Sequence, residues 1–369
     1  MNNSDRVFGL DLMRAVAILL VVIGHLGWAV GGEKHSLSPV FAFSSFLGVE
    51  IFFVLSGFLI GRILVRMFSG DFSVRQIRVF LKRRWYRTLP NYYLILLANI
   101  AIAAFLGYEI EQLSKYFLFL QNFAWPMLPF FTESWSLPIE EFAYIVLPGT
   151  LLIGLLTARN GSRKIIFICV VLMLVLAGGI FKYLNHINHP TPTIDQWNLG
   201  VKSVVVFRID SICIGAAFAW ISIFCAEIWA KSKYLLAGCG LFGIGFYFIG
   251  VGYFRLLIEN YPMFWNVFYL PLLSVILALF LPLLSGWNSV ANLVARPITY
   301  ISLISYSLYL VHYGIVLQLM NEYLPVGIVS VPIFVAVYLM ATFTISTILY
   351  KFYEKPMMDR REPREKIVN

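Results

Sequence analysis

The chain has 369 residues, of which 60% are hydrophobic and only 13% are charged. Soluble domains carry about 25% charged residues, so this composition excludes a soluble globular protein and indicates a polytopic membrane protein. The net charge of +9 at pH 7 is no sign of nucleic-acid binding, because the cytoplasmic loops of membrane proteins are rich in Lys and Arg.

Ten apolar runs predict an all-α, polytopic transmembrane helical bundle of about ten helices. We expect the spans at about 8–30, 44–64, 85–107, 135–157, 164–184, 203–224, 234–252, 264–284, 299–320 and 328–350. Most of the 28 Lys and Arg residues then fall on the side that holds both chain ends, which predicts an N-in, C-in orientation. The membrane domain is expected at 1–357 and a basic cytoplasmic tail at 358–369, with no separate globular domain.

The first run carries Asp11, Arg14 and His25, which an ordinary anchor helix avoids; residues 8–28 read FGLDLMRAVAILLVVIGHLGW. On a helix, Arg14 and His25 project from the same side, about 16 Å apart along the axis, and Asp11 lies one turn before Arg14. Such a polar stripe must face protein or a wet cavity, so this helix is predicted to form one wall of a buried site. The same polar residues argue against a cleaved signal peptide.

The second span and the segment after it contain the next charges to explain. Arg62 near the inner end of the span either snorkels to the interface or takes part in a site, and Ser56-Gly57 predicts a close helix approach. The segment 66–87, expected as a cytoplasmic loop, is the most basic part of the chain. Its cations contact either lipid headgroups or a phosphate-bearing ligand.

The fourth span opens with SWSLPIEEFAYIVLP, which places two adjacent acids, Glu140 and Glu141, just after Trp135. Adjacent helical residues point about 100° apart, and acids are costly at this depth, so at least one is expected to face the protein interior. The outer segment before it, 108–134, is expected to lie along the membrane face as a short helix over a site.

Three further groups are open to a structural or a functional interpretation. Arg208 and Asp210 at the start of the sixth span predict a local ion pair, which either joins two helices or contacts substrate. His312 in the ninth span, one turn after Tyr309, is either a hydrogen-bonded structural residue or part of the chemistry. The histidines in the loop 185–202 are expected to be solvated, so no metal site is predicted.

The arrangement as a whole indicates a class of chemistry. Histidine is the side chain best suited to proton transfer near neutral pH, and His25 is predicted nearer the outer face than Arg14. With the basic residues at the inner side, this layout suits a long, phosphate-bearing cytosolic donor that is threaded toward a base.

These motifs, in this order, resemble those of the acyltransferase-3 family, integral membrane enzymes that O-acetylate surface polysaccharides, lipid-linked sugars and some small molecules. The similar stretches lie between residues 8 and 357 and read GLDLMRAVAILLVVIGH, SGFLIGR, SWSLPIEEFAYIVLP, FRIDSICIG, SYSLYLVH and YEKP. The resemblance implies that Arg62 is functional and that Glu140 matters more than Glu141. Ala143 departs from the Phe that the family usually has there. No outer SGNH-type hydrolase-like domain is expected, and the expectation is therefore the standalone form of the family.

The resemblance implies a bacterial inner-membrane O-acetyltransferase, with acetyl-CoA as donor and a sugar hydroxyl of an envelope polysaccharide or lipid-linked glycan as acceptor. His25 would be the base or a transient acyl carrier, and Glu140 would orient it. The donor and acceptor would be held by Arg14, Arg62, Asp11, Arg208, Asp210, Trp135, Glu141 and His312. Alternatives are a glycan transporter or flippase, or an acyltransferase for a small molecule or lipid. The lipid bilayer is the other expected partner, nucleic acid is not, and the oligomeric state is open.

Overall fold

The computed structural model describes residues 6–32, 37–158, 161–288 and 290–360, so residues 361–369 of the expected tail lie outside the described residues. Within these ranges the fold is all-α, with no β-strand and one isolated bridge between Val326 and Val329. Ten of its helical segments are long and apolar enough to cross a membrane. The predicted all-α bundle with ten spans is therefore confirmed, and the N-in, C-in orientation stays a prediction.

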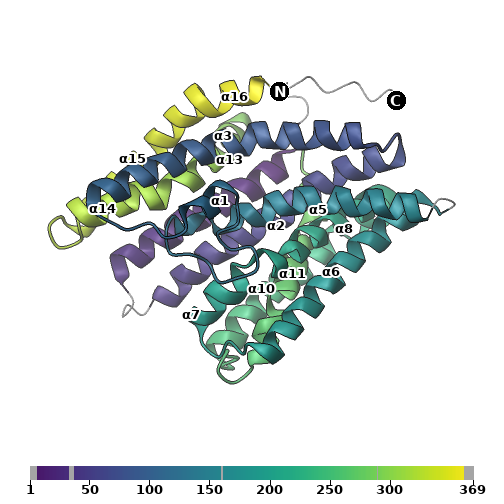
Figure 1. Ribbon diagram of the computed structural model, residues 1–369, viewed down its shortest axis with the longest axis horizontal. Coiled ribbons are helices and arrows are strands. Elements are labelled where there is room, and N and C mark those ends of the chain that lie inside the picture. Colours follow the sequence, from purple (N-terminus) through teal and green to yellow (C-terminus); the bar gives the residue numbers. More distant parts are fainter. Residues whose placement is uncertain (1–5, 33–36, 159–160, 289, 361–369) are drawn as a thin grey trace.

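The described chain begins and ends at the same end of the bundle, as an even number of crossings requires (Figure 1). The main helices are α1 (Phe8–Gly31), α2 (Ser38–Ser69), α3 (Val74–Leu106), α5 (Ser136–Thr157), α6 (Arg163–Asn188), α8 (Ile209–Phe224), α10 (Lys233–Gly252), α11 (Tyr269–Ala278), α13 (Asn292–Val311) and α15 (Val331–Leu349). The short ones are α4 (Leu113–Phe117), η2 (Thr132–Trp135), α7 (Ile194–Trp197), η3 (Asn198–Lys202), η4 (Val205–Phe207), α9 (Ala226–Lys231), η5 (Phe264–Phe268), α12 (Leu281–Ser285), η6 (His312–Leu317), α14 (Gln318–Tyr323), η7 (Tyr350–Glu354) and α16 (Lys355–Asp359).

The basic segment after the second span is helical, which corrects the expected loop at 66–87. Helix α2 runs on to Ser69, and α3 begins at Val74 after a turn of four residues, 70–73. Ser73 caps α3, because its hydroxyl accepts a hydrogen bond from the Gln76 backbone N–H at 3.5 Å. Between Val74 and Arg87 there is no Gly or Pro, so nothing interrupts the helix. Its basic side chains are therefore held at fixed positions.

Helix α2 lies at the centre of the bundle and packs closely against both α1 and α8 (Figure 1). A Cβ atom at Gly57 would lie 2.0 Å from the backbone oxygen of Ile212, and one at Gly215 of α8 would lie 2.3 Å from the Val54 oxygen. The predicted close approach at Ser56-Gly57 is therefore confirmed. Small residues allow this contact because transmembrane helices associate mainly through close packing.

Two buried ion pairs connect α8 to its neighbours, and they correct the expected pair between Arg208 and Asp210. Arg208 pairs with Glu50 of α2, and Asp210 pairs with Lys182 of α6, and all four side chains are fully buried. Residues two apart on a helix project from different sides, so Arg208 and Asp210 cannot face each other. Ser274 of α11 donates to Glu50 at 3.5 Å, which brings a further helix into the network. These charges join helices inside the bundle.

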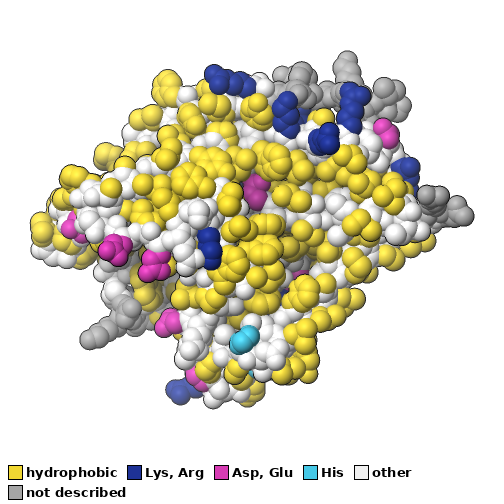
Figure 2. Space-filling model, in the orientation of Figure 1, with side chains coloured by type: hydrophobic (Ala, Val, Ile, Leu, Met, Phe, Trp, Pro, Cys, Tyr) yellow, Lys and Arg dark blue, Asp and Glu magenta, His cyan; other side chains and the backbone are white. Residues whose placement is uncertain are grey.

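Hydrophobic side chains cover most of the face seen in Figure 2. Large hydrophobic side chains elsewhere on the surface are also largely exposed in the isolated chain, for example Phe105 at 79% and Phe242 at 78%, as expected for surfaces that meet lipid. Most of the Lys and Arg side chains in this view gather at the upper right, near the chain ends. Most of the Asp and Glu side chains in this view lie at the left and lower left, toward α14 and the loop before α15, and a few lie elsewhere (Figures 1 and 2). The two ends of the bundle therefore differ in charge.

Candidate active site

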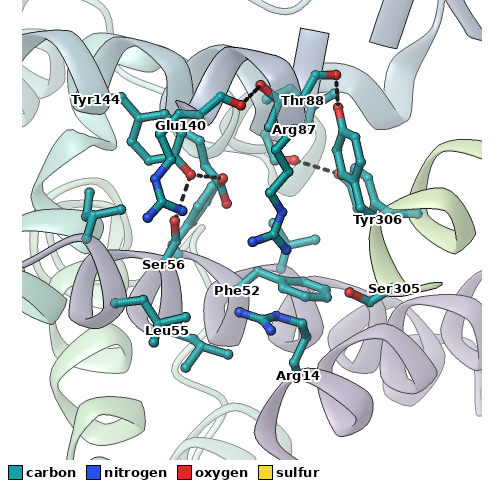
Figure 3. A pocket seen from close by; sticks show the side chains of 18 residues that line it. Arg14, Phe52, Leu55, Ser56, Arg87, Thr88, Glu140, Tyr144, Ser305 and Tyr306 are labelled. Atoms are coloured by element: carbon teal, nitrogen blue, oxygen red, sulfur yellow. Dashed lines mark hydrogen bonds between the residues drawn. The ribbon is translucent and has the colours of Figure 1, made fainter. Parts of the chain in front are cut away.

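An internal cavity of about 90 Å³ lies between α1, α2, α3, α5 and α13. We call it the arginine cavity, because Arg14, Arg84 and Arg87 are among its lining residues and Glu140 is the only acid among the described residues that line it. Arg14 from α1 and Arg87 from α3 reach toward each other from opposite walls, beside Phe52 (Figure 3). Within the described part of the chain, Arg87 forms no ion pair with an acidic side chain. An excess of guanidinium groups in a partly enclosed space suits a ligand with phosphate groups.

Glu140 enters this cavity as part of a small hydrogen-bonded group. The Tyr144 hydroxyl donates to Glu140 Oε2 at 2.6 Å and lies 3.0 Å from the Ser56 hydroxyl (Figure 3). The neighbouring Glu141 points toward α3, where the Thr88 hydroxyl donates to its Oε1 at 2.6 Å. Both acids thus face protein, and Glu141 fixes the turn of α3 that carries Arg87. Glu141 therefore lies outside the lining of the arginine cavity.

The strongest contact of His25 is with His312. The Nδ1 atom of His25 lies 2.9 Å from Nε2 of His312, and Nδ1 of His312 lies 2.7 Å from the Tyr309 carbonyl oxygen and 3.1 Å from that of Leu308. A carbonyl oxygen only accepts, so Nδ1 of a neutral His312 carries the hydrogen and its Nε2 accepts. His25 must then donate through Nδ1, which leaves the lone pair on its Nε2 available. His312 is fully buried, whereas His25 is partly accessible.

A change of helix type positions His312. The α-helical pattern of α13 ends at Val311, and residues His312–Leu317 form the π-helical turn η6. In a π-helix the backbone hydrogen bonds reach one residue further, so the carbonyl groups before the turn become available to a side chain. The Tyr309 carbonyl meets the His312 ring in this way, and the Leu308 carbonyl, which also accepts the His312 backbone N–H, makes a second and longer contact with the ring. The local backbone therefore sets the tautomer of both histidines.

Arg14 and His25 lie in different surroundings in the structure. Arg14 lines the arginine cavity and His25 does not. Tyr309 connects the two regions, because it lines the cavity and its ring centroid lies 5.9 Å from that of His312. Aromatic side chains fill the space in between, with Phe52 at 6.4 Å from Tyr309. Glu140 makes no described hydrogen bond to His25, and the described ring partner of His25 is His312.

The other predicted binding residues lie outside the arginine cavity. Asp11 is held by Arg6, at 2.5 Å, and by the Ser302 hydroxyl at 2.8 Å, and it lies 4.0 Å from Arg14. Arg62 lies over the ring of Phe58, with 5.8 Å from its guanidinium carbon to the ring centroid. The Trp135 ring packs against Phe53, and the Lys202 ammonium group lies over it. Arg208 and Asp210 belong to the two buried ion pairs described above.

Arg84 and Arg87 are the cationic cavity residues that the sequence analysis did not name individually. Both belong to the basic segment, and their spacing with Thr88 follows the i, i+3, i+4 pattern of one helix face. This spacing indicates a shared face only if the segment is helical, and the sequence analysis expects a loop there.

Comparison with protein families matches residues 7–351 to the model of an acyltransferase domain. The chain belongs to the acyltransferase-3 family. With ten apolar helices, this member of the family is an integral, multi-pass membrane protein.

Relatives of this family member include OatA of Listeria monocytogenes, named a peptidoglycan O-acetyltransferase, and YrhL of Bacillus subtilis, provisionally given the same name. Each is 26% identical over 376 residues, which is 94% of this chain for OatA and 95% for YrhL. A Staphylococcus aureus protein provisionally named an O-acetyltransferase is 26% identical over 378 residues, 94% of this chain. The chain spans only 54 to 56% of the length of these relatives. No solved structure matches it.

Proposed function

We propose that the protein is a membrane O-acetyltransferase that moves an acetyl group from cytoplasmic acetyl-CoA to a sugar hydroxyl of a cell-envelope glycan or its lipid-linked precursor. Family membership and the names of the relatives support acyl transfer to oxygen. The observation that carries the proposal is the His25–His312 pair, which leaves one imidazole lone pair of His25 available on the same helix as Arg14.

The donor would bind at the arginine cavity. Its phosphate groups would be neutralised by Arg14, Arg84 and Arg87, which outnumber the single lining carboxylate. The thioester would lie at the end of the long pantetheine arm and would have to pass Tyr309 to reach His25, about 16 Å from Arg14 along α1. Bound donor would therefore be accompanied by a movement of the aromatic side chains.

In the transfer step, the acceptor hydroxyl oxygen attacks the thioester carbonyl carbon while its proton passes to His25 Nε2. The new C–O bond forms, the C–S bond breaks, and coenzyme A leaves as a thiolate. The proton on His25 then returns to that sulfur, so the base is regenerated. His312 accepts the Nδ1–H of His25 throughout and stabilises the positive charge that develops on the ring.

The test is transfer of radiolabel from acetyl-CoA into membrane glycan, with release of free coenzyme A measured in the same membranes. A positioned base contributes about 10²- to 10⁴-fold, so His25→Ala should lose that factor while the protein stays folded. His189→Ala, which changes an exposed histidine, is the matched control.

Transfer by His25→Ala at the parent rate would refute the role of His25. Movement of a glycan across vesicles without release of coenzyme A would instead favour a transporter, and label found in a lipid or small molecule would reject the glycan acceptor.

A further inference from the structure

A second and larger cavity, of about 510 Å³, lies at the opposite end of the bundle from the basic segment of α3. It is enclosed by the end of α3, the segment 108–131, η2, η6 and α14. We call it the glutamate cavity, because its lining includes Glu109, Glu111, Glu133 and Glu322 and no Lys, Arg or His. In the predicted orientation it opens to the outside of the cell. It shares no lining residue with the arginine cavity.

Glu133 is the acid that the fold builds into this wall. It is 5% exposed, its Oε1 accepts the Gly314 backbone N–H at 2.7 Å, and its Oε2 has no hydrogen-bond partner among the described residues. A Cβ atom at residue 314 would lie 2.4 Å from Glu133 Oε1 and 2.6 Å from Asn99 Oδ1, so only glycine fits there. A buried carboxylate oxygen without a partner is costly, which indicates that a ligand donor completes the site.

The rest of the lining has the chemistry of a sugar site. Side-chain amides come from Asn99, Gln318 and Asn321, and aromatic rings come from Tyr108 and Tyr313, among others. Amides and carboxylates accept hydrogen bonds from hydroxyl and amino groups, and aromatic faces pack against the apolar faces of rings. A concave site of several hundred Å³ with few directed polar groups is typical of small-ligand binding.

The glutamate cavity also approaches the proposed base. Tyr313 lines it, and the Tyr313 ring centroid lies 4.9 Å from that of His25. An acceptor bound there would lie one ring away from His25, on the side opposite to the arginine cavity.

We propose that the glutamate cavity binds the acceptor and selects it by charge. It would accept glycans whose bound sugars are uncharged or carry amino groups, and it would reject glycans whose bound sugars carry carboxylates or phosphates. The role as acceptor site rests on the proposed function, whereas the charge selection rests on the lining alone. The lining holds four acidic side chains, of which Glu109, Glu111 and Glu322 are exposed, and the described lining holds no cation, so the local potential disfavours an anionic sugar. Partly enclosed walls strengthen this field.

The test measures binding of three soluble probes to the purified full chain in detergent, without acetyl-CoA. The probes are a chito-oligosaccharide, its partly deacetylated form with free amines, and a hyaluronan oligosaccharide with carboxylates. We expect the amine form to bind most tightly and the hyaluronan form most weakly, with a difference that shrinks in salt. Glu133→Gln keeps the acceptor for Gly314 and removes the charge, so it should weaken the amine form by about tenfold and leave the neutral form nearly unchanged. Glu259→Gln, an exposed acid outside the cavity, is the matched control.

Equal binding of the three probes, tightest binding of hyaluronan, or binding of none would overturn the proposal. The same variants are then assayed for acetyl transfer in membranes. Charge-dependent binding of the probes without any acetyl transfer would refute the proposed function, while the binding site would still be supported. Acetyl transfer with the same acceptor KM in the parent and in Glu133→Gln would refute the acceptor role of the cavity, while the proposed function would still be supported.

Discussion

Replacement of His312 is the most direct test of how the candidate base is held. In the structure its Nε2 accepts from His25 Nδ1 at 2.9 Å, and the His312 ring is fully buried. His312→Phe keeps a flat ring and removes this acceptor, so the Nδ1–H of His25 is left unsatisfied. An unsatisfied buried donor costs about 1–3 kcal/mol. At about 1.4 kcal/mol per factor of ten, kcat should fall by roughly 5- to 150-fold.

The assay is the initial rate of radiolabel transfer from acetyl-CoA in membranes, with kcat and KM determined separately. The KM for acetyl-CoA should stay unchanged, because His312 does not line the arginine cavity. His312→Gln is the matched variant, since its amide oxygen can occupy the position of Nε2, and it should recover most of the rate. A kcat for His312→Phe within about twofold of the parent, at equal amounts of folded protein, would refute the orienting role.

Three further predictions concern charge. Arg87→Ala should raise the KM for acetyl-CoA by about 10- to 100-fold with a small effect on kcat, because charge-assisted hydrogen bonds contribute about 1.5–3 kcal/mol. Lys351→Ala, which changes an exposed cation, is the control. An unchanged KM in Arg87→Ala would contradict the proposed donor site. Arg208→Met should lower the thermal midpoint of unfolding strongly, because it leaves Glu50 buried and unpaired at a cost of about 3–5 kcal/mol. The double variant Arg208→Met with Glu50→Gln should recover much of the lost midpoint. Equal losses of midpoint in the single and the double variant would argue against the ion pair. Burial, reinforced by Arg208 and opposed by Glu50, lowers the pKa of Lys202 to about 8. Between about pH 8 and 10.5 the Lys202 side chain therefore binds more protons in the unfolded chain than in the folded one, so it should make the free energy of unfolding rise with pH in that window. The measurement is the thermal midpoint as a function of pH, and Lys202→Met should remove this contribution to its rise.

The sequence predicts the spans and the polar face of the first helix well, because both follow from local periodicity. Arg14 faces a cavity, and both Glu140 and Glu141 face protein, as the cost of acids at this depth requires. The prediction of a loop at 66–87 was wrong for a different reason. Net charge is a poor guide to backbone conformation, whereas helix propensity over 74–87 favours a helix.

The contacts that the sequence could not predict depend on long-range packing. His25 and His312 are 287 positions apart, and their meeting requires a π-helical turn that has no known residue signature. Glu133 was missed because a single acid before a helix resembles a cap, and its meaning depends on Gly314 in a distant element. The choice of Glu50 as the partner of Arg208 likewise depends on how α2 and α8 are brought together.

The separation of the two cavities has a consequence for the cell that contains this protein. The two cavities share no lining residue, and Tyr309 of the arginine cavity and Tyr313 of the glutamate cavity both lie beside the histidine pair. In the proposed function, donor and acceptor would then meet at this pair from two separate cavities, so the acyl group would change sides of the membrane without either substrate crossing it.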